Sequence, residues 1–237
     1  EGDEIARVAP VLDALYTDEM LLSIDTRKAA VAEAALGKGA RIVNDVSGLT
    51  HDPRMAEVVA RAQCPLVLMH MAGTPQTMQT APRYADCALD VFDWLEAAIA
   101  GADAKGIARL RIIADPGIGF GKSLAHNLAL INQLSLFHAL GVPLLLGASR
   151  KRLIGALSNE APVEQRLGGS VALVLAGLAQ GAQLLRVHDV PESVQAMRVW
   201  RGLRDAALMP SLTDNAAARP TSEQLHEVAS AAHRTMN

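Results

Sequence analysis

The sequence predicts an α/β protein built as a parallel barrel, and three observations support this fold class. Short apolar runs alternate with helical segments along the whole chain, which is the pattern of βαβ units and a parallel sheet. The runs at 143–149 and 184–189 are continuously apolar before they end in cations, and continuous apolar runs are typical of strands buried on both faces. Nearly every run ends in a polar side chain. A barrel collects functional groups from the ends of many strands, whereas an open doubly wound sheet collects them at one switch point, so the barrel is favoured.

The elements follow one another in a regular order. An opening helix at 5–15 carries apolar residues with the spacing of one helical face. Six strands are predicted at 21–25, 41–45, 65–71, 110–117, 143–149 and 184–189. Helices are predicted at 28–37, 53–62, 87–105, 125–140, 164–181 and 191–208. A barrel of this type has eight strands, so we expect two βα units to be missing before Glu1 and the first and last strands to have unpaired edges.

The composition changes after Leu208. Residues 1–208 are predicted to form the barrel domain, with its N-terminal part missing, and residues 209–237 a linker followed by a short helix or tail. Pro210, Ser211 and Pro220 are typical of a linker, and Thr221 with Gln224 has the spacing of a helix capping box.

Charge and cysteine usage exclude several classes of partner. The formal net charge is −3 and the chain has no dense basic run, which argues against nucleic acid. No apolar run approaches the roughly 20 residues of a membrane span, and we recognise no signal peptide. Cys64 and Cys87 lack metal or redox spacing, so we expect reduced thiols in a cytoplasmic protein.

The segment Gly117–Ser123, GIGFGKS, resembles a phosphate loop but does not match one. Three residues separate Gly117 from Gly121, where a Walker A motif has four before its Gly-Lys pair. One interpretation is a flexible turn after a strand. The other, which we favour, is a loop that lets backbone approach a ligand, with Phe120 as a wall or lid.

Asp25, Asn44 and Asp115 each end a predicted strand, and buried carboxylates are costly without partners. A flat heterocycle with a guanidine-like edge, such as a pterin, could supply the donors, with Lys151 on its opposite side. Alternatively, Asp115 could belong to an internal salt-bridge network with Lys151 or Arg186. The residues alone leave both interpretations open.

Six motifs in the same order resemble those of dihydropteroate synthases, the folate-pathway members of the pterin-binding barrel family. They are SIDT at 23–26, NDVSG at 44–48, LMHMAGTPQTMQ at 68–79, DPGIGFGK at 115–122, GASRK at 147–151 and RVHD at 186–189. Each motif alone is weak, but the ordered set is specific. The resemblance implies a (β/α)8 TIM barrel of the pterin-binding type, with six of its eight strands in this chain. It also implies a homodimer and a sulfonamide target.

The resemblance implies an activity and a role for particular residues. The enzyme would condense 6-hydroxymethyl-7,8-dihydropterin diphosphate with 4-aminobenzoate and release diphosphate, aided by Mg²⁺. Ser149 and Lys151 would border the 4-aminobenzoate site, Arg186 and His188 would bind the diphosphate, and Lys151, Arg186 and Asp25 would act in catalysis. The pterin would contact eight residues, namely Asp25, Asn44, Val46, Met69, Asp115, Phe120, Gly147 and Lys151.

Two features of the family are absent from this sequence. The family's first strand carries an Asn that meets magnesium, so we expect no metal ligand in this chain. The second is a Ser-Thr-Arg-Pro loop over the aminobenzoate. We therefore expect the chain alone to make little dihydropteroate. Two alternatives stay open: a methyltetrahydrofolate-binding methyltransferase of the same superfamily, which would not need the cationic residues, and a non-catalytic pterin-binding protein.

Overall fold

The structure is a computed structural model that describes residues 1–17, 20–73, 78 and 82–208. The chain divides into two compact units, Glu1–Met197 and Arg198–Asn237. In the second unit, the described residues are the end of the last helix, where Arg204 stacks over the Trp200 ring. The predicted linker and short helix at 209–237 lie outside the described residues, and the predicted boundary after residue 208 stays a prediction.

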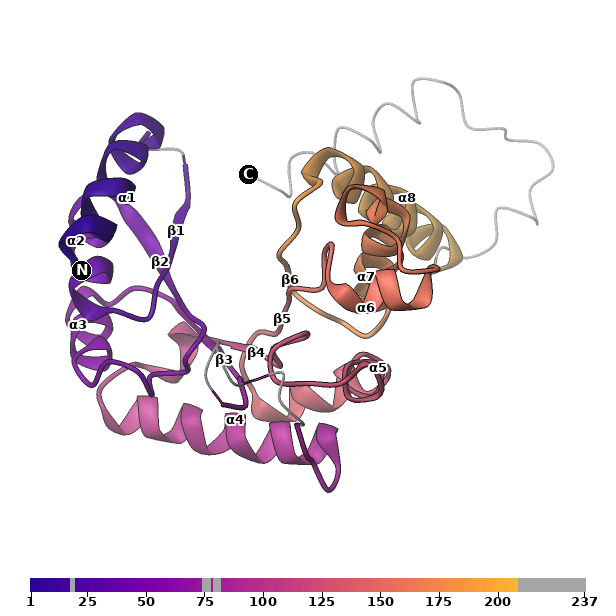
Figure 1. Ribbon diagram of the computed structural model, residues 1–237, viewed down its shortest axis with the longest axis horizontal. Helices are drawn as coiled ribbons and strands as arrows, with labels where there is room; N and C mark the ends of the chain where they lie inside the picture. Colours follow the sequence, from indigo (N-terminus) through magenta and orange to yellow (C-terminus); the bar gives the residue numbers. More distant parts are fainter. Residues whose placement is uncertain (18–19, 74–77, 79–81, 209–237) are drawn as a thin grey trace. The chain divides into compact units, whose positions relative to one another are not determined.

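Six parallel strands form the centre of the first unit (Figure 1). They are β1 (Leu22–Asp25), β2 (Ala40–Asp45), β3 (Leu66–Met69), β4 (Ile112–Asp115), β5 (Leu145–Leu146) and β6 (Leu184–Leu185). Strands β1 to β4 pair in chain order, a parallel bridge from Ala114 to Leu144 continues the order, and β5 pairs with β6. This order has no switch point, so the barrel prediction is confirmed over the doubly wound sheet. Within the described residues, β1 and β6 each pair along one edge only.

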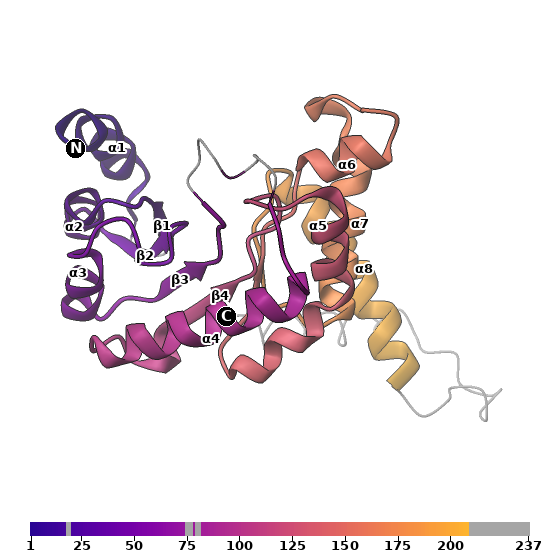
Figure 2. The ribbon, with the colours of Figure 1, turned by 60° about the horizontal axis from the view of Figure 1, so that its bottom comes forward.

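Helices alternate with the strands as predicted. They are α1 (Gly2–Leu15), α2 (Ala29–Gly37), α3 (Met55–Ala62), α4 (Cys87–Ala104), α5 (Leu124–Asn132), α6 (Arg152–Leu157), α7 (Leu167–Ala179) and α8 (Val190–Leu208), with 3-10 turns at Arg109–Arg111, Leu134–Leu140 and Val163–Gln165. In Figures 1 and 2, α1 to α3 stack beside β1 and β2, and α5 contacts α6. None of the helices in the described ranges is long and apolar enough to cross a membrane.

The predicted helix at 125–140 is wrong in its second half. Helix α5 ends at Asn132, and residues Leu134–Leu140 form a 3-10 helix instead. The Gln180 side chain, just after α7, donates to the Ile131 carbonyl and accepts the Ser135 N–H. These bonds satisfy backbone groups that a continuous helix would have paired internally. The short helix α6 was not predicted.

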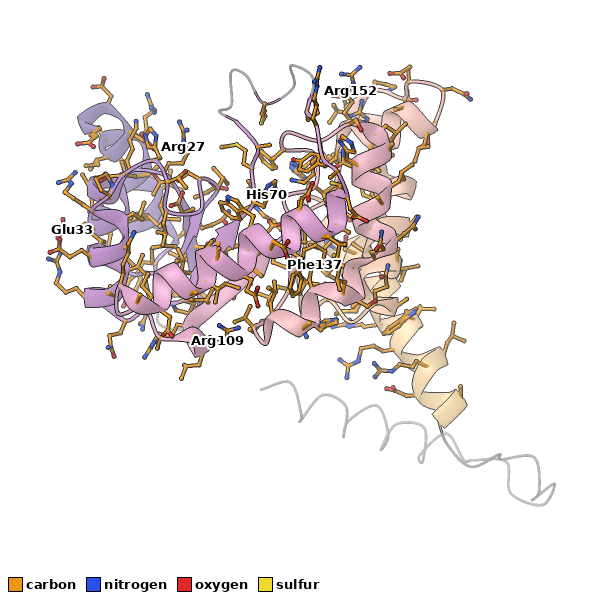
Figure 3. All side chains as sticks on the ribbon, turned by 90° about the horizontal axis from the view of Figure 1, so that it is seen from below. Arg27, Glu33, His70, Arg109, Phe137 and Arg152 are labelled. Carbon is orange, nitrogen blue, oxygen red and sulfur yellow. The ribbon has the colours of Figure 1, made fainter. Side chains whose placement is uncertain are left out.

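The core is aliphatic, and the central strands are buried on both of their faces. Leu66, Leu68 and Phe137 belong to the main cluster that packs strands against helices (Figure 3). Val67 and Ile113, which alternate with those positions, form a separate cluster with Leu145. Two-sided burial explains why these strands are continuous apolar runs in the sequence. Cys64 and Cys87 are buried free thiols.

Candidate active site

The polar side chains predicted for the site converge at the carboxyl ends of the strands. The pairing of β1 with β2 aligns Asp25 with Asn44, and the pairing of β3 with β4 aligns Met69 with Asp115. Asn44 donates through Nδ2 to Asp25 Oδ2 over 3.0 Å. Arg186, from the far end of the chain, donates to the same oxygen over 3.2 Å. The last residue of β1 and the residue that follows β6 are therefore in direct contact.

Asn44 has an unsatisfied acceptor. The residue is 9% exposed, and its Oδ1 is the one buried side-chain polar atom in the described residues without a hydrogen-bond partner. Leaving a buried acceptor unpaired costs about 1–3 kcal/mol. A buried acceptor without a partner at the carboxyl ends of the strands indicates that a ligand supplies the donor.

Asp45, the next residue, serves the fold instead. It is fully buried and accepts from the Ser47 N–H and hydroxyl and from the Leu49 N–H over 2.6–2.9 Å. These bonds hold the tight turn after β2, in which Gly48 lies under the Trp94 ring. Neighbouring side chains on a strand point to opposite faces, which separates the two roles.

Asp115 is buried and has an unusual acidity. Its Oδ1 accepts the Gly117 N–H over 2.8 Å, and burial raises the pKa of this carboxyl to about 6. No ion pair joins Asp115 to either cation of the alternative network, and Arg186 pairs with Asp25 instead. For Asp25 too, burial raises the pKa, opposed by Arg186 and the Asn44 hydrogen bond.

The glycines after β4 allow close contact with the protein's own backbone. Gly117 has φ +71°, and a Cβ there would lie 2.0 Å from the His70 carbonyl oxygen. Gly121 has φ +64°, and a Cβ there would lie 2.6 Å from the Ala72 carbonyl oxygen. Close packing on the segment after β3 therefore explains these two glycines, and the approach of a ligand to the loop stays a prediction.

The Lys122 side chain binds to the carbonyl oxygens of this loop. Its ammonium lies 2.8 Å from Nδ1 of His70 and 3.0 Å from the carbonyl oxygens of Gly117 and Phe120. His70 is buried, and its ring meets Trp94 edge-on beside α4 (Figure 3). Burial and the neighbouring Lys122 lower the pKa of His70 to about 3, so the ring is neutral.

Lys151 lies across the loop from these groups. Its Nζ is 4.0 Å from the centre of the Phe120 ring, a cation–π distance. Burial lowers the pKa of Lys151, while Asp115 opposes that shift. A cavity of about 380 Å³ opens here, lined by Lys151, Gly119, Asn127 and Arg152 among others.

The motifs at 147–151 and 186–189 contact each other through hydrogen bonds and an ion pair. Ser149 Oγ accepts the His188 N–H over 3.2 Å and lies 3.0 Å from that residue's ring Nδ1. Arg150 forms a two-pronged ion pair with Asp189. Arg186 and His188 follow β6 rather than belonging to it. The rule that residues two apart in a strand point to the same face therefore does not apply to their side chains. They contact different partners, Asp25 and Ser149.

The remaining predicted residues line the same end of the strands. Val46 follows β2 and is half-buried, whereas Met69 ends β3 and is buried. Gly147 follows β5, and a Cβ there would lie 3.9 Å from Asp115 Oδ2. Of the motif at 68–79, residues 74–77 and 79 lie outside the described residues.

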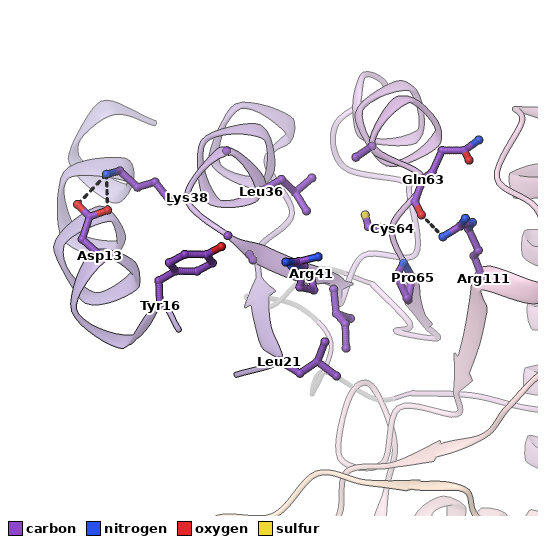
Figure 4. A pocket seen from close by; sticks show the side chains of 15 residues that line it. Asp13, Tyr16, Leu21, Leu36, Lys38, Arg41, Gln63, Cys64, Pro65 and Arg111 are labelled. Atoms are coloured by element: carbon purple, nitrogen blue, oxygen red, sulfur yellow. Dashed lines mark hydrogen bonds and ion pairs between the residues drawn. The ribbon is translucent and has the colours of Figure 1, made fainter. Parts of the chain in front are cut away.

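A large hollow lies at the opposite end of the strands. It measures about 950 Å³ and is lined by Tyr16, Leu21, Arg41 and Arg111 among others (Figure 4). These residues precede β1, β2 and β4 or lie at their starts. Functional groups of barrels sit at the carboxyl ends, so we place the site at Asn44 and Asp115.

Nothing in the described ranges provides a metal site by itself. No group of three or more His, Cys, Asp or Glu side chains in those ranges could hold a metal ion. The magnesium that the resemblance implies therefore stays a prediction, since Mg²⁺ is commonly held by one or two protein groups together with substrate phosphates.

Comparisons with known proteins agree with this geometry. The family model described as pterin binding enzyme matches residues 1–188. The chain belongs to the pterin-binding enzyme family. Among curated members, it is 44% identical over 198 residues to dihydropteroate synthase of Escherichia coli K12, covering 83% of this chain and 70% of that protein.

Solved structures of family members confirm the barrel fold. Dihydropteroate synthase of Yersinia pestis, in a sulfonamide drug complex, has a TM-score of 0.84 and 43% identity over 87% of this chain and 75% of its own. The Xanthomonas albilineans enzyme in complex with 7,8-dihydropteroate has a TM-score of 0.79 and 42% identity over 84% of this chain and 73% of its own.

Proposed function

We propose that this chain is a dihydropteroate synthase that binds a pterin at the carboxyl ends of β1 to β4. It would condense 6-hydroxymethyl-7,8-dihydropterin diphosphate with 4-aminobenzoate in folate biosynthesis. One observation carries the proposal: the buried, unpaired Oδ1 of Asn44, at the end of a strand in the pterin-binding family. Family membership at this level of identity supports a transferase.

The heterocycle would be read by acceptors on neighbouring strands. Asp25 and Asp115 end β1 and β4, Asn44 is the penultimate residue of β2, and the three present carboxylate and amide oxygens. The amino-pyrimidine edge of a pterin presents N–H donors, and such hydrogen bonds to ionised acceptors are the strong ones. Val46, Met69, Phe120 and Gly147 would shape the slot around the flat ring.

The cationic half would handle the leaving group and the second substrate. Arg186 and His188 would bind the diphosphate, since a guanidinium suits phosphate oxygens. The 380 Å³ cavity beside Lys151 has the size of a small-molecule site and would take 4-aminobenzoate. Ser149, predicted for the same substrate, is not among the residues that line this cavity. The Ser149 hydroxyl already contacts His188, so this residue would act partly by holding the imidazole.

The reaction needs orientation and charge stabilisation. The arylamine nitrogen would attack the pterin methylene, the C–O bond to diphosphate would break, and the amine would lose one proton. Asp25, Asn44 and Asp115 would orient the pterin, while Lys151 and Arg186 would stabilise the charge on the departing oxygen. The described residues supply no metal cluster, and we assign no step to magnesium.

A binding experiment with Asn44 tests the proposal. Calorimetry should detect 6-hydroxymethylpterin binding to the chain, and Asn44→Leu should weaken it at least about tenfold, by removing one hydrogen bond and its geometry. Asn132→Leu, at the exposed end of α5, is the matched control and should bind normally. Unchanged affinity in Asn44→Leu, or no binding by the unaltered chain, would contradict the proposal.

Turnover separates an enzyme from the non-catalytic alternative. Release of diphosphate that depends on 4-aminobenzoate would establish synthase activity, whereas pterin binding without turnover would leave a binding protein. The methyltransferase alternative does not explain the cations Lys151 and Arg186 beside Asp115 and Asp25.

The homodimer and the cytoplasmic location are further parts of the proposal. Helix α7, LGGSVALVLAGLA, is apolar around its whole circumference, yet only Ser170, Val174 and Gly177 are buried. A helix apolar all round is normally covered, and a second copy of the chain would cover it. Light scattering should give twice the chain mass of 25.0 kDa, and a monomer at micromolar concentration would contradict this part.

A further inference from the structure

We propose that Lys122 is a positioning residue of the site: its buried ammonium holds the loop after β4 in place and supplies the positive charge opposite Asp115. The part that concerns ligand binding rests on the pterin site proposed above. Lys122 was not among the predicted site residues, although it also lines the cavity beside Lys151.

The hydrogen bonds of Lys122 are complete. An ammonium has three donors, and three acceptors lie within 3.0 Å: His70 Nδ1, the Gly117 oxygen and the Phe120 oxygen. The residue is 3% exposed, so water does not provide for its charge. A buried ammonium is costly unless it is hydrogen-bonded, and this arrangement of acceptors has no other evident purpose.

Each acceptor belongs to a segment that carries the site. Gly117 is the residue whose N–H binds Asp115, and Phe120 is the ring that meets Lys151. His70 directly follows β3, and because its Nδ1 accepts from Lys122, its proton lies on Nε2. One side chain thus ties together the ends of β3 and β4 and the wall beside Lys151.

The charge of Lys122 matters as well as its shape. Ionisable groups face it from β4 (Asp115), from α4 (Cys87), from the start of α6 (Lys151) and from the end of β3 (His70). Burial lowers the pKa of Lys122 to about 7, and Asp115 opposes that shift. Reciprocally, Lys122 lowers the pKa of Asp115, which burial raises to about 6. The two groups therefore support each other's ionisation near neutral pH.

The decisive measurement needs no ligand. A ¹³C NMR titration of the Asp115 carboxyl, assigned with Asp115→Asn, should show its midpoint about one pH unit higher in Lys122→Met, the size expected for a lost neighbouring charge. Lys122→Arg keeps the charge and should leave the midpoint near that of the unaltered chain. Lys105→Met, an exposed lysine after α4, is the control. An unchanged midpoint in folded Lys122→Met would overturn the inference.

The unaltered chain gives a second reading if Lys122→Met does not fold. The Asp115 carboxyl resonance should show a second step near pH 7 that coincides with the titration of the Lys122 ammonium. Its absence would equally overturn the inference.

Ligand binding then shows whether the charge reaches the site. Lys122→Met should bind 6-hydroxymethylpterin about threefold more weakly at pH 6.5, because a rise of the Asp115 pKa from about 6 by about one unit lowers its ionised fraction from roughly three-quarters to roughly one-quarter. The deficit should shrink by pH 9, where Asp115 is ionised in both proteins and Lys122 is uncharged. A deficit equal at both pH values would mean a purely structural brace and would reject the electrostatic role. If the unaltered chain binds no pterin, the proposed function fails, while the titration still decides on Lys122.

Discussion

The four strands β1 to β4 and the two strands β5 and β6 build the two halves of the site by different means. In the first half, Asn44, His70 and Asp115 are buried and held by internal bonds, whereas the Asp25 side chain at the edge is 44% exposed. In the second half the strands shrink to two residues, and the Arg186 side chain is 57% exposed. Fixed, dehydrated acceptors suit recognition of a flat heterocycle, whereas exposed cations suit an anion that must leave.

The difference extends to the backbone. Gly117, after β4, lies against other backbone, whereas Gly147, after β5, has only ordinary contacts. If this contrast is right, a methyl group at Gly117 should damage folding, and one at Gly147 should mainly affect ligand binding.

The two glycines that follow β4 and β5 give the largest expected contrast. Gly117→Ala puts a Cβ 2.0 Å from the His70 oxygen at φ +71°, which should cost about 2–5 kcal/mol from the left-handed backbone and overpacking together. Gly147→Ala meets only ordinary contacts at 3.8–3.9 Å and should change the free energy of unfolding by less than about 1 kcal/mol. Urea unfolding measures both.

These two glycine variants can also contradict the comparison. Since the Gly147 methyl would point toward Asp115 Oδ2, Gly147→Ala should still weaken pterin binding. Equal loss of stability in the two variants would remove the contrast between the halves.

Asp115→Asn should stabilise the chain, and only above the pKa of Asp115. Burial raises that pKa from its ordinary value of 3.8 to about 6, so the folded chain binds this proton more tightly than the unfolded chain. The free energy of unfolding therefore falls as pH rises from about 4 to about 6, and the loss persists above. Asparagine removes it, giving a gain of about 3 kcal/mol at pH 7.5 and none at pH 4.

Urea unfolding at the two pH values checks this sign. Asp93→Asn, exposed on α4, should show no such difference. A gain of the same size at both pH values would assign the effect to packing instead of ionisation.

The same substitution should impair binding. Hydrogen bonds to charged groups contribute roughly 1.5–3 kcal/mol, so Asp115→Asn should weaken pterin affinity about ten- to a hundredfold. Calorimetry with 6-hydroxymethylpterin measures it. Unchanged affinity would make Asp115 a structural residue of the first half, and the comparison would lose its functional meaning.

The sequence predicted the first half of the site better than the second, for a physical reason. Asp25, Asn44 and Asp115 lie at or next to the ends of strands of four to six residues, so strand ends and polar ends coincide. After β5 and β6 the chain leaves the strand early, and the alternation of a strand does not set the directions of Arg186 and His188. Strand length depends on hydrogen bonding with neighbours, which apolar runs do not report.

Other features depend on contacts distant in sequence. Asn44 and Asp45 are adjacent polar residues, and only the turn bonds to Ser47 and Leu49 assign the second to the fold. Lys122 stood in a recognised motif, but its partner His70 lies 52 residues away. A lysine directly after a glycine-rich turn was the available signal, and it could equally have meant a phosphate ligand.

The smallest expected effect separates the two cations of the second half. Arg186 contacts Asp25 at the rim and is largely exposed, whereas Lys151 lies against Phe120 near Asp115. Arg186→Ala should therefore weaken binding of the pterin diphosphate about tenfold, the value of one charge-assisted contact, with little effect on a pterin lacking phosphate. Lys151→Ala should weaken both ligands, because its ammonium faces the ring side of the site.

Calorimetry with the two pterins compares the variants directly. Arg198→Ala, which changes an arginine on α8 distant in sequence from the predicted site residues, is the control for loss of positive charge. If Arg186→Ala weakened both pterins equally, its contact with Asp25 would be part of ring recognition. Arg186 would then belong with the ring-binding groups of the first half, although it follows β6. The division of the site between β4 and β5 would not hold.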